Sequence, residues 1–325
     1  MKWIYRFPYA LLVIALFAAC TPAGERSGHI VVKESQRIFG GDEVQVQSGS
    51  SLTVAMITLD DDMGQSFVCT GTFISARLLL TASHCVTTNK SQMRVLFGAA
   101  PFAGTAFVDV PIADVHVYHE IVADGSSAET GKRHDLALIE IRGLPDGART
   151  AELPESAQGQ DLQLKNDSRA ATAVIQSSRQ TLLHAQNLGF VALGYGRLDG
   201  LDLGASDTGG SGVLRRVDLS AENYSAKATT FTVLQETGER GVCFGDSGGP
   251  ALLERTTVDG VSAVVMGVAS GVLDLEGADP YAHGYDACKQ RSIYMNVIPY
   301  LPWIERIQKK VDLLRQNSDT TGTIQ

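Results

Sequence analysis

The segment Gly241-Val-Cys-Phe-Gly-Asp-Ser-Gly-Gly-Pro250 places a serine inside a run of glycines. On its own, such a run is often only a tight loop. Two other segments, Leu80-Thr-Ala-Ser-His-Cys85 and Arg133-His-Asp-Leu-Ala-Leu-Ile139, supply a histidine and an aspartate. Each of these also has an ordinary structural explanation when taken alone. Their joint occurrence, in the order His84, Asp135, Ser247, indicates a shared site.

Short runs rich in β-branched and aliphatic residues surround these three segments. Examples are Leu78–Thr81, Leu136–Ile141 and Ala263–Val268, each bounded by turn-forming residues. Groups of such runs lie on either side of an irregular stretch at 142–187, which is rich in Ala, Ser, Gln and Asp. We therefore expect an all-β chain with two β units. One terminal helix is expected at Tyr300–Gln308.

The composition excludes several classes of protein. The chain has 325 residues, of which 44% are hydrophobic and 19% charged, and its formal net charge is −9. This hydrophobic content is typical of a globular protein and argues against disorder or a fibrous repeat. The negative charge argues against a nucleic-acid binder with a general basic face.

Taken together, these segments resemble the trypsin-like (chymotrypsin-fold) serine proteases of the S1 family. Gly245-Asp-Ser-Gly-Gly-Pro250 matches the serine motif of that family in full. Thr81-Ala-Ser-His-Cys85 is similar to its histidine motif, with serine where alanine is usual, and Asp135-Leu-Ala-Leu138 is similar to its aspartate motif. Three further segments are similar to family segments: Ile38-Phe-Gly-Gly41, Leu193-Gly-Tyr-Gly-Arg197 and Tyr300-Leu-Pro-Trp-Ile304.

The resemblance covers about residues 38–310 and carries expectations for fold and function. It implies two six-stranded antiparallel β-barrels, divided near 142–187, with a C-terminal α-helix. It also implies hydrolysis of peptide bonds without a cofactor or metal ion. The residues from 311 to 325 are expected to form a flexible polar tail.

The chemistry explains why the three residue types occur together. A serine hydroxyl is a weak nucleophile until an imidazole takes its proton, and the imidazole then protonates the leaving amine. A buried carboxylate orients the imidazole and stabilises its charged form. We therefore assign Ser247 as nucleophile, His84 as general base and acid, and Asp135 as the orienting group. By resemblance, the backbone N–H groups of Gly245 and Ser247 form the oxyanion hole.

The resemblance further implies an inactive precursor. Cleavage after Arg37 would give Ile38 a free α-amino group. In the family this ammonium pairs with the aspartate before the nucleophile, here Asp246, and orders the oxyanion hole. The alternative is that Asp246 only forms a turn.

The expected specificity differs from that of trypsin. In the family, the residue six positions before the nucleophile forms the floor of the substrate pocket, and here it is Gly241 rather than an aspartate. Within the predicted pocket, Ser270 resembles the residue that pairs with the substrate backbone, and Val272 and Ser292 fall where the pocket walls are usually glycine. We expect small aliphatic residues, rather than Lys or Arg, before the cleaved bond. The chain would then not activate itself at Arg37, so a separate activating protease is expected.

The N-terminus predicts export. Lys2 and Arg6 precede an apolar run at 10–19, as in a secretory signal peptide covering 1–19. The run ends Leu16-Phe-Ala-Ala-Cys20, which resembles a bacterial lipobox, so Cys20 is expected to be lipidated and 20–37 to be a lipidated propeptide. The protein would then lie in a bacterial cell envelope, or be released after activation. The alternatives are an ordinary signal peptide and a buried helix.

Five cysteines fit this expectation of export. If Cys20 carries lipid, four remain, and these allow three pairings. The family pattern selects Cys69–Cys85 and Cys243–Cys288.

Two other functional interpretations stay open. A binding or scaffold protein on the same fold could use the insertions at 142–187 and 198–212 as a contact surface, although a binder does not need all three chemical groups. A lipoprotein whose protease domain stays latent is the other.

The acidic residues of the long loop 272–287, Asp274, Glu276 and Asp279, could bind Ca²⁺, but a solvated acidic loop is favoured. For the serine endopeptidase, the expected partners are a protein or peptide substrate and the activating protease.

Overall fold

The computed structural model describes most of the chain from residue 38 onward. The described residues are 38, 41–61, 63–121, 127–128, 134–154, 184–200, 210–235, 240–257, 260–273 and 285–321. All of them belong to the second of two compact units, Met1–Ser35 and Gln36–Gln325. The predictions of a signal peptide, a lipidated Cys20 and an Arg37 cleavage site lie outside the described residues. So do most of the 142–187 and 272–287 insertions, including Asp274, Glu276 and Asp279.

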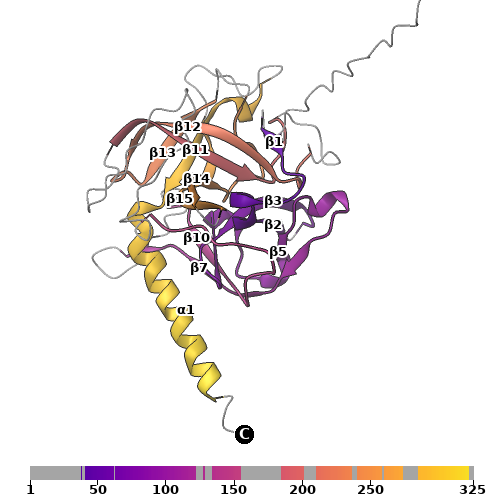
Figure 1. The fold of residues 1–325 in the computed structure, drawn as a ribbon, viewed down its shortest axis with the longest axis vertical. Coiled ribbons are helices and arrows are strands. Elements are labelled where there is room, and N and C mark those ends of the chain that lie inside the picture. Colours follow the sequence, from indigo (N-terminus) through magenta and orange to yellow (C-terminus); the bar gives the residue numbers. More distant parts are fainter. Residues whose placement is uncertain are drawn as a thin grey trace, which may run out of the picture. The chain divides into compact units, whose positions relative to one another are not determined.

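The first sheet is antiparallel and closes into a barrel, because Pro111 joins the strands at its two ends. Its strands are β2 (Val54–Asp60), β3 (Ser66–Phe73), β4 (Leu78–Thr81), β5 (Met93–Phe97), β6 (Val108–Val110), β7 (Ile112–Val117) and β10 (Ala137–Ile141). They follow the order β6-β5-β2-β3-β4-β10-β7. Five of them, β2, β3, β5, β7 and β10, are labelled in Figure 1. Pro111 alone joins the two strands at the ends of this order, and proline lacks the N–H that would continue the ladder. Counted with β6 and β7 as one interrupted strand, this is a six-stranded barrel.

The second sheet is also antiparallel and closes by pairing its own strands. Its strands are β1 (Asp42–Glu43), β11 (His184–Gly194), β12 (Arg215–Ser225), β13 (Thr230–Leu234), β14 (Pro250–Thr257), β15 (Gly260–Leu273) and β16 (Arg291–Asn296). The order is β1-β12-β11-β14-β15-β16-β13, and Glu222 of β12 pairs with Thr232 of β13 to close a ring of six. Strand β1 pairs with β12 outside that ring. The two sheets confirm the expected all-β fold with two barrels.

Short elements connect these strands. The 3-10 helices are η1 (Gly49–Thr53), η2 (Ser83–Cys85), η3 (Lys90–Gln92), η4 (Pro101–Ala103), η5 (Ala287–Lys289) and η6 (Ile298–Tyr300). Strands β8 (Glu120–Ile121) and β9 (Ser127–Ala128) form a separate small sheet. Among the described residues, no helix combines the length and apolar character needed to cross a membrane.

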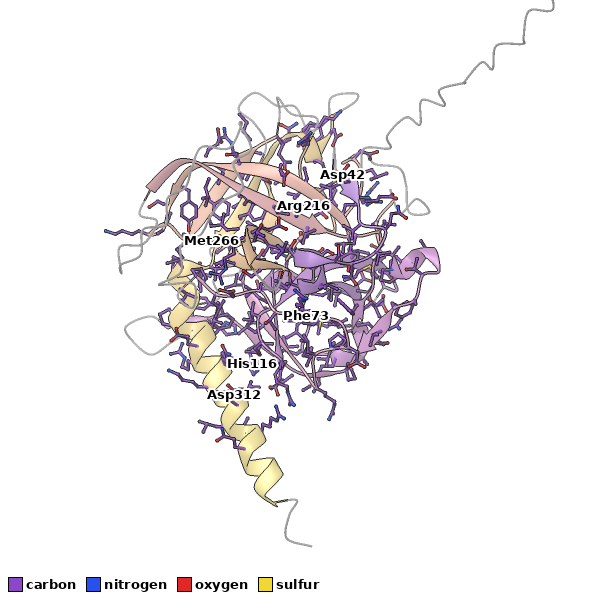
Figure 2. The ribbon with its side chains drawn as sticks, in the orientation of Figure 1. Asp42, Phe73, His116, Arg216, Met266 and Asp312 are labelled. Carbon is purple, nitrogen blue, oxygen red and sulfur yellow. A yellow bond between two sulfur atoms is a disulfide. The ribbon has the colours of Figure 1, made fainter. Side chains whose placement is uncertain are left out.

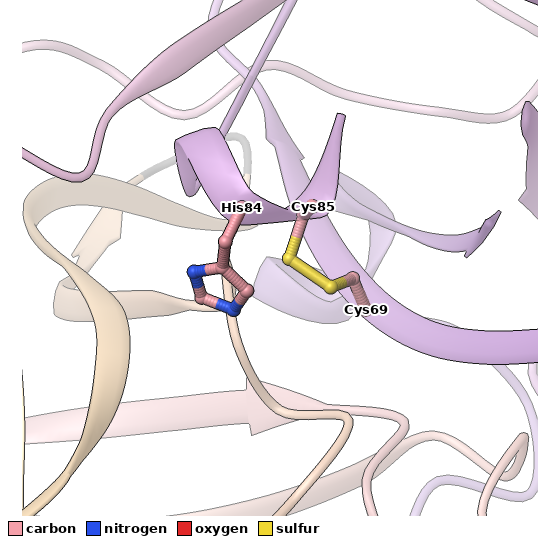
Figure 3. A group of neighbouring side chains, drawn as sticks. All are labelled: Cys69, His84 and Cys85. Atoms are coloured by element: carbon pink, nitrogen blue, oxygen red, sulfur yellow. A yellow bond between two sulfur atoms is a disulfide. The ribbon is translucent and has the colours of Figure 1, made fainter. Parts of the chain in front are cut away.

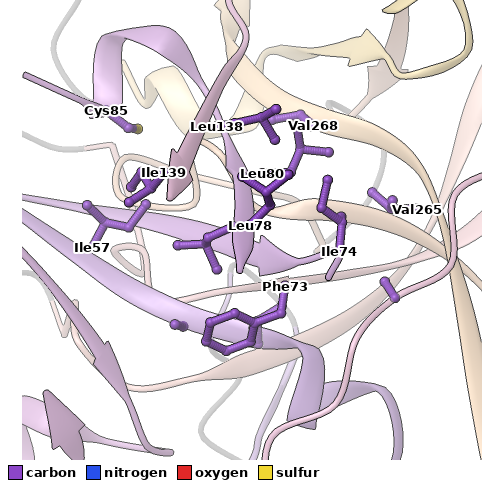
Figure 4. Packing of buried hydrophobic residues seen from close by; sticks show 14 of the residues in the cluster. Ile57, Phe73, Ile74, Leu78, Leu80, Cys85, Leu138, Ile139, Val265 and Val268 are labelled. Carbon is purple, nitrogen blue, oxygen red and sulfur yellow. The ribbon is translucent and has the colours of Figure 1, made fainter. Parts of the chain in front are cut away.

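The hydrophobic core joins the two sheets. One buried cluster contains Phe73, Leu80 and Leu138 from the first sheet together with Val265 and Val268 from the second (Figure 4). A second cluster lies on strands of the second sheet and includes Phe190, Phe231, Met266 and Tyr294. Phe73 and Met266, one from each cluster, are marked in Figure 2. Burial of this apolar surface holds the loops at the ends of the strands in fixed relative positions.

The terminal helix corrects one expectation. Helix α1 begins at Leu301, one residue after the predicted start, and runs to Thr321, well past the predicted end at Gln308 and into the segment 311–325 that was expected to be a tail. The reason is that the apolar face at Leu301 and Ile304 continues to Val311, which is 2% exposed. No glycine or proline interrupts the chain between 303 and 321.

Candidate active site

His84 and Asp135 come together because their strands are neighbours. His84 lies in η2, just after β4 ends at Thr81, and Asp135 lies just before β10 begins at Ala137. In the antiparallel pair β4–β10, Ala137 is opposite Thr81. Both side chains therefore emerge at the same end of this strand pair.

The carboxylate of Asp135 holds the imidazole of His84. His84 Nδ1 lies 2.8 Å from Asp135 Oδ2, and the backbone N–H of His84 donates to Asp135 Oδ1 at 3.0 Å. The side chain of His84 is 47% exposed and that of Asp135 is 9% exposed. An ionised carboxylate can only accept, so Nδ1–H donates to it and Nε2 is left as the proton acceptor.

Two serine hydroxyls complete the surroundings of Asp135. Ser83 Oγ donates to Oδ1 at 2.7 Å, and Ser270 Oγ donates to Oδ2 at 2.6 Å. Burial alone would raise the pKa of Asp135. The hydrogen bonds and charge of His84, with the hydroxyls of Ser270 and Ser83, outweigh burial and lower the pKa to about 2. Asp135 is therefore ionised at neutral pH.

The loop of Ser247 is held between the two sheets. Thr70 of β3 donates its backbone N–H to the carbonyl oxygen of Ser247 at 2.8 Å, and Gly248 N–H donates to the carbonyl of Ala269 in β15 at 2.7 Å. Gly245 has a φ of 97°, which strains any residue with a side chain. Ser247 itself is half-buried.

The serine loop lies against the histidine loop. Cys85 Sγ is 3.6 Å from the carbonyl oxygen of Ser247. A Cβ on Gly248 would lie 2.1 Å from Thr81 Oγ1, which is closer than any real contact. The structure thus brings the loops of all three predicted catalytic residues together.

Asp246 is buried beside two glycines of the Leu193–Arg197 segment. Its Oδ1 accepts the backbone N–H of Gly196 at 2.8 Å, and its Oδ2 accepts that of Cys243 at 2.8 Å. Burial raises the pKa of Asp246 to about 6, although these hydrogen bonds and the charge of Arg215 act in the opposite direction. A Cβ on Gly196 would lie 2.5 Å from the carboxyl carbon, so glycine there is required by Asp246.

Arg215, which the sequence analysis did not single out, supports the same region. Its side chain is completely buried, and its guanidinium donates to the carbonyls of Gly196 at 2.9 Å and Gly210 at 2.8 Å. An arginine at the start of an ordinary strand gives no sequence signal of this role.

The side chain of Gln235, which the sequence analysis did not single out, also lies beside the predicted pocket residues. A Cβ on Gly241 would lie 2.5 Å from Gln235 Cδ, so the glutamine side chain fills the space beside this glycine. Ser292 is fully buried and donates to Gln235 Oε1 at 3.0 Å, so its hydroxyl faces the glutamine. Val272 is half-buried and lies opposite Ser292 in the β15–β16 register. Ser270, expected to pair with the substrate backbone in the pocket, donates its hydroxyl to Asp135.

The structure contains the disulfides Cys69–Cys85 and Cys243–Cys288. The imidazole of His84 lies beside the first of these (Figure 3). Because both sulfur atoms are already bonded to each other, Cys69 and Cys85 offer no thiolate for a metal ion next to His84. The second disulfide joins the serine loop to η5.

Removing the second disulfide is expected to destabilise the protein more than removing the first. The cysteines are 16 residues apart in Cys69–Cys85 and 45 apart in Cys243–Cys288. Because the longer loop restricts the unfolded chain more, paired Cys→Ala variants should lose about 3 and about 4 kcal/mol respectively. Urea unfolding of the two variants under oxidising conditions measures both values. A larger loss for the Cys69–Cys85 pair would contradict the chain-entropy explanation.

The sequence of this chain is similar to those of known proteins. The Trypsin family model matches residues 38–304. The chain is 25% identical over 288 residues to Serine protease Hayan of Drosophila melanogaster, covering 82% of this chain and 38% of that protein. It is 21% identical over 280 residues to the venom plasminogen activator Haly-PA of Gloydius brevicauda, covering 85% and 88%. It is 26% identical over 157 residues to Trypsin 5G1 of Aedes aegypti, covering 45% and 54%.

The chain thus spans less than two thirds of the length of two of these relatives. Among solved structures, HL collagenase matches with a TM-score of 0.49 and 19% identity, covering 83% of this chain and 97% of that one. The family model covers most of the sequence, including all three chemical motifs. The chain therefore belongs to the Trypsin family.

Proposed function

We propose that the chain is the precursor of a serine endopeptidase that uses Ser247, His84 and Asp135 to hydrolyse peptide bonds. The observation that carries the proposal is the bond from His84 to an ionised, buried Asp135 next to the loop of Ser247. In a member of the Trypsin family, this arrangement leaves His84 Nε2 available to take the serine proton.

The reaction follows from the roles of these groups. His84 Nε2 takes the proton of Ser247 Oγ as that oxygen attacks the carbonyl carbon of the substrate. The negative oxygen of the tetrahedral intermediate is stabilised by the backbone N–H groups of Gly245 and Ser247. His84 then protonates the leaving amine, and water repeats the sequence to release the acyl group. Asp135 stays ionised and stabilises the charged imidazole.

Activation is proposed to occur by cleavage after Arg37. Ile38 is fully buried in the cluster of the second sheet, and its φ is 42°. A β-branched residue in this conformation is strained by about 1–3 kcal/mol. Cutting the bond before Ile38 removes the constraint that the preceding chain places on it, which favours a new position for the freed end.

Asp246 is the proposed acceptor of that new ammonium. In the described structure its buried carboxylate is supported by two N–H groups and by the charge of Arg215. The pKa of about 6 indicates that burial outweighs this support. An ammonium beside Asp246 would lower this pKa and stabilise the charged form, so the site favours an additional cation.

The proposed preference is for small aliphatic residues before the cleaved bond. Gly241 provides no carboxylate for a basic side chain, and the neutral amide of Gln235 occupies the adjacent space. Val272 narrows the pocket wall. Since neither Lys nor Arg would be bound well, a separate protease is proposed to cut after Arg37.

The proposed location is outside the cytoplasm, where both disulfides can form. We propose that Cys20 anchors the precursor to a bacterial membrane through lipid. Cleavage at Arg37 would then separate the protease domain from its anchor. Its partners would be the activating protease and a protein or peptide substrate.

A fluorophosphonate probe tests the proposed function. The probe should label the full chain cut after Arg37 at least about a hundredfold faster than the uncut chain, because the new ammonium of Ile38 is proposed to order the oxyanion hole. Mass spectrometry should place the label on Ser247, and N-terminal sequencing should show Ile38 as the new terminus.

Ser247→Ala should abolish this labelling, while Ser66→Ala, at an exposed serine of β3, should not change it. A correctly cut and folded chain that the probe does not label would exclude the endopeptidase and favour a binding protein on the same fold.

A further inference from the structure

A second group of potential ligands lies on the neighbouring strands β7 and β10. Asp114 is opposite Glu140 in the strand register, and His116 is opposite Leu138. Opposed residues of an antiparallel pair, and residues two apart on one strand, share a side of the sheet. One ligand atom from each of Asp114, His116 and Glu140 lies within 4.8 Å of the others. His116 is marked in Figure 2.

The imidazole of His116 is nine-tenths buried and faces this group. Its side chain is 10% exposed, and its Nε2 atom is buried with no hydrogen-bond partner among the described residues. A buried polar nitrogen without a partner is costly, because it has lost its hydrogen bonds to water. Nε2 lies 3.5 Å from Glu140 Oε2, which is longer than an N–H···O hydrogen bond.

The charges of the group favour a cation. Two carboxylates placed directly opposite each other on paired strands repel. Arg77 Nη2 is 3.7 Å from Glu140 Oε1, so it reduces the repulsion at that oxygen. Glu140 Oε2, on the other hand, faces His116, and Asp114 is exposed with its own negative charge. The edge of the group at Asp114 is therefore open to an ion from solvent.

We propose that Asp114, His116 and Glu140 bind one divalent transition-metal ion of the Zn²⁺ type. Tetrahedral ligands at 2.0–2.2 Å from zinc are about 3.4 Å from each other, close to the 3.5 Å between Nε2 and Oε2. The imidazole nitrogen favours Zn²⁺ over Ca²⁺ and Mg²⁺, which prefer oxygen ligands. Water would complete the coordination at the exposed side. The ion would clamp β7 to β10, the strand that follows Asp135.

Direct binding measurements test this proposal. The full chain, purified without a histidine tag and treated with chelator, is titrated with Zn²⁺ by calorimetry and with Co²⁺ by visible absorption. We expect one ion per chain, a Co²⁺ spectrum typical of nitrogen and oxygen ligands, and a higher thermal midpoint with Zn²⁺. Absence of Zn²⁺ binding to the folded chain would overturn the proposal.

Matched variants locate the ion. His116→Ala, Asp114→Asn and Glu140→Gln should each weaken Zn²⁺ binding by at least about tenfold. His119→Asn, which removes an exposed imidazole three residues further along, and His84→Gln should leave binding unchanged. Asp114 is exposed, so Asp114→Asn should fold normally and keeps the test valid if His116→Ala does not. Binding that survives Asp114→Asn and His116→Ala, or that is lost with His84→Gln or His119→Asn, would refute the site.

Discussion

Replacing either Ser247 or His84 by alanine is expected to lower kcat of the activated protease by about a millionfold. Without the hydroxyl there is no nucleophile, and without the imidazole nothing takes the proton from that hydroxyl. Since each group needs the other, the double variant should be no slower than either single variant. Steady-state hydrolysis of a peptide substrate by chains cut after Arg37 measures all three rates.

The fall should appear in kcat, with KM little changed, because neither side chain is proposed to bind the ground-state substrate. The residual rate should still exceed the rate in water by about a thousandfold or more, owing to the oxyanion hole and substrate binding. His119→Asn serves as the control for loss of an exposed imidazole. Losses that multiply in the double variant would show that the two residues act independently, against the proposed mechanism.

The residues of the candidate site could be predicted because its motifs are local, and their chemistry stays a prediction. The segments around His84, Asp135 and Ser247 each combine a reactive residue with neighbours that fix the backbone, such as Gly245 with its positive φ. The barrel strands were also predictable where they are apolar throughout. Leu78–Thr81, for example, is expected from the sequence and observed as β4 with the same bounds.

Some strands that contain both charged and apolar residues were not predicted from the sequence. Strand β12 begins with two arginines, one of which is completely buried, so its alternation of apolar and polar residues is masked at its start. Strand β7 carries Asp114 and His116, which obscure its pattern in the same way. In both cases a partner far along the chain determines the strand, and a sequence does not reveal that partner.

Contacts between distant segments were missed for the same reason. Ser83 and Ser270 both donate to Asp135, yet they are 187 residues apart, and nothing in the sequence near either serine shows that its hydroxyl reaches this carboxylate. Gln235 meets Ser292 because β13 and β16 are paired. The family resemblance predicts Gly241 at the floor of the pocket but gives no indication of the side chain beside it.

Asp135→Asn should lower kcat of the activated protease by about ten thousandfold at neutral pH. The amide is almost the same size, so the fold is expected to persist. Its NH2 group, however, would donate to His84 Nδ1, which would move the imidazole proton to Nε2. His84 could then no longer accept the proton of Ser247. Asp109→Asn, at an exposed carboxylate of β6 that pairs with Arg94, is the matched control and should retain full activity.

The same variant should change how stability depends on pH. The pKa of Asp135 is lowered to about 2 in the folded protein, against about 3.9 for an unfolded chain. Its contribution is therefore fully present above pH 4 and is lost as the pH falls through 2. The difference of about 1.9 pKa units corresponds to about 3 kcal/mol. Urea unfolding between pH 2 and 6 should thus show a weaker acid dependence for Asp135→Asn than for the parent. An equal dependence in the two proteins would mean that Asp135 is not held ionised by His84, Ser83 and Ser270, and the proposed orientation of the imidazole would lose its basis.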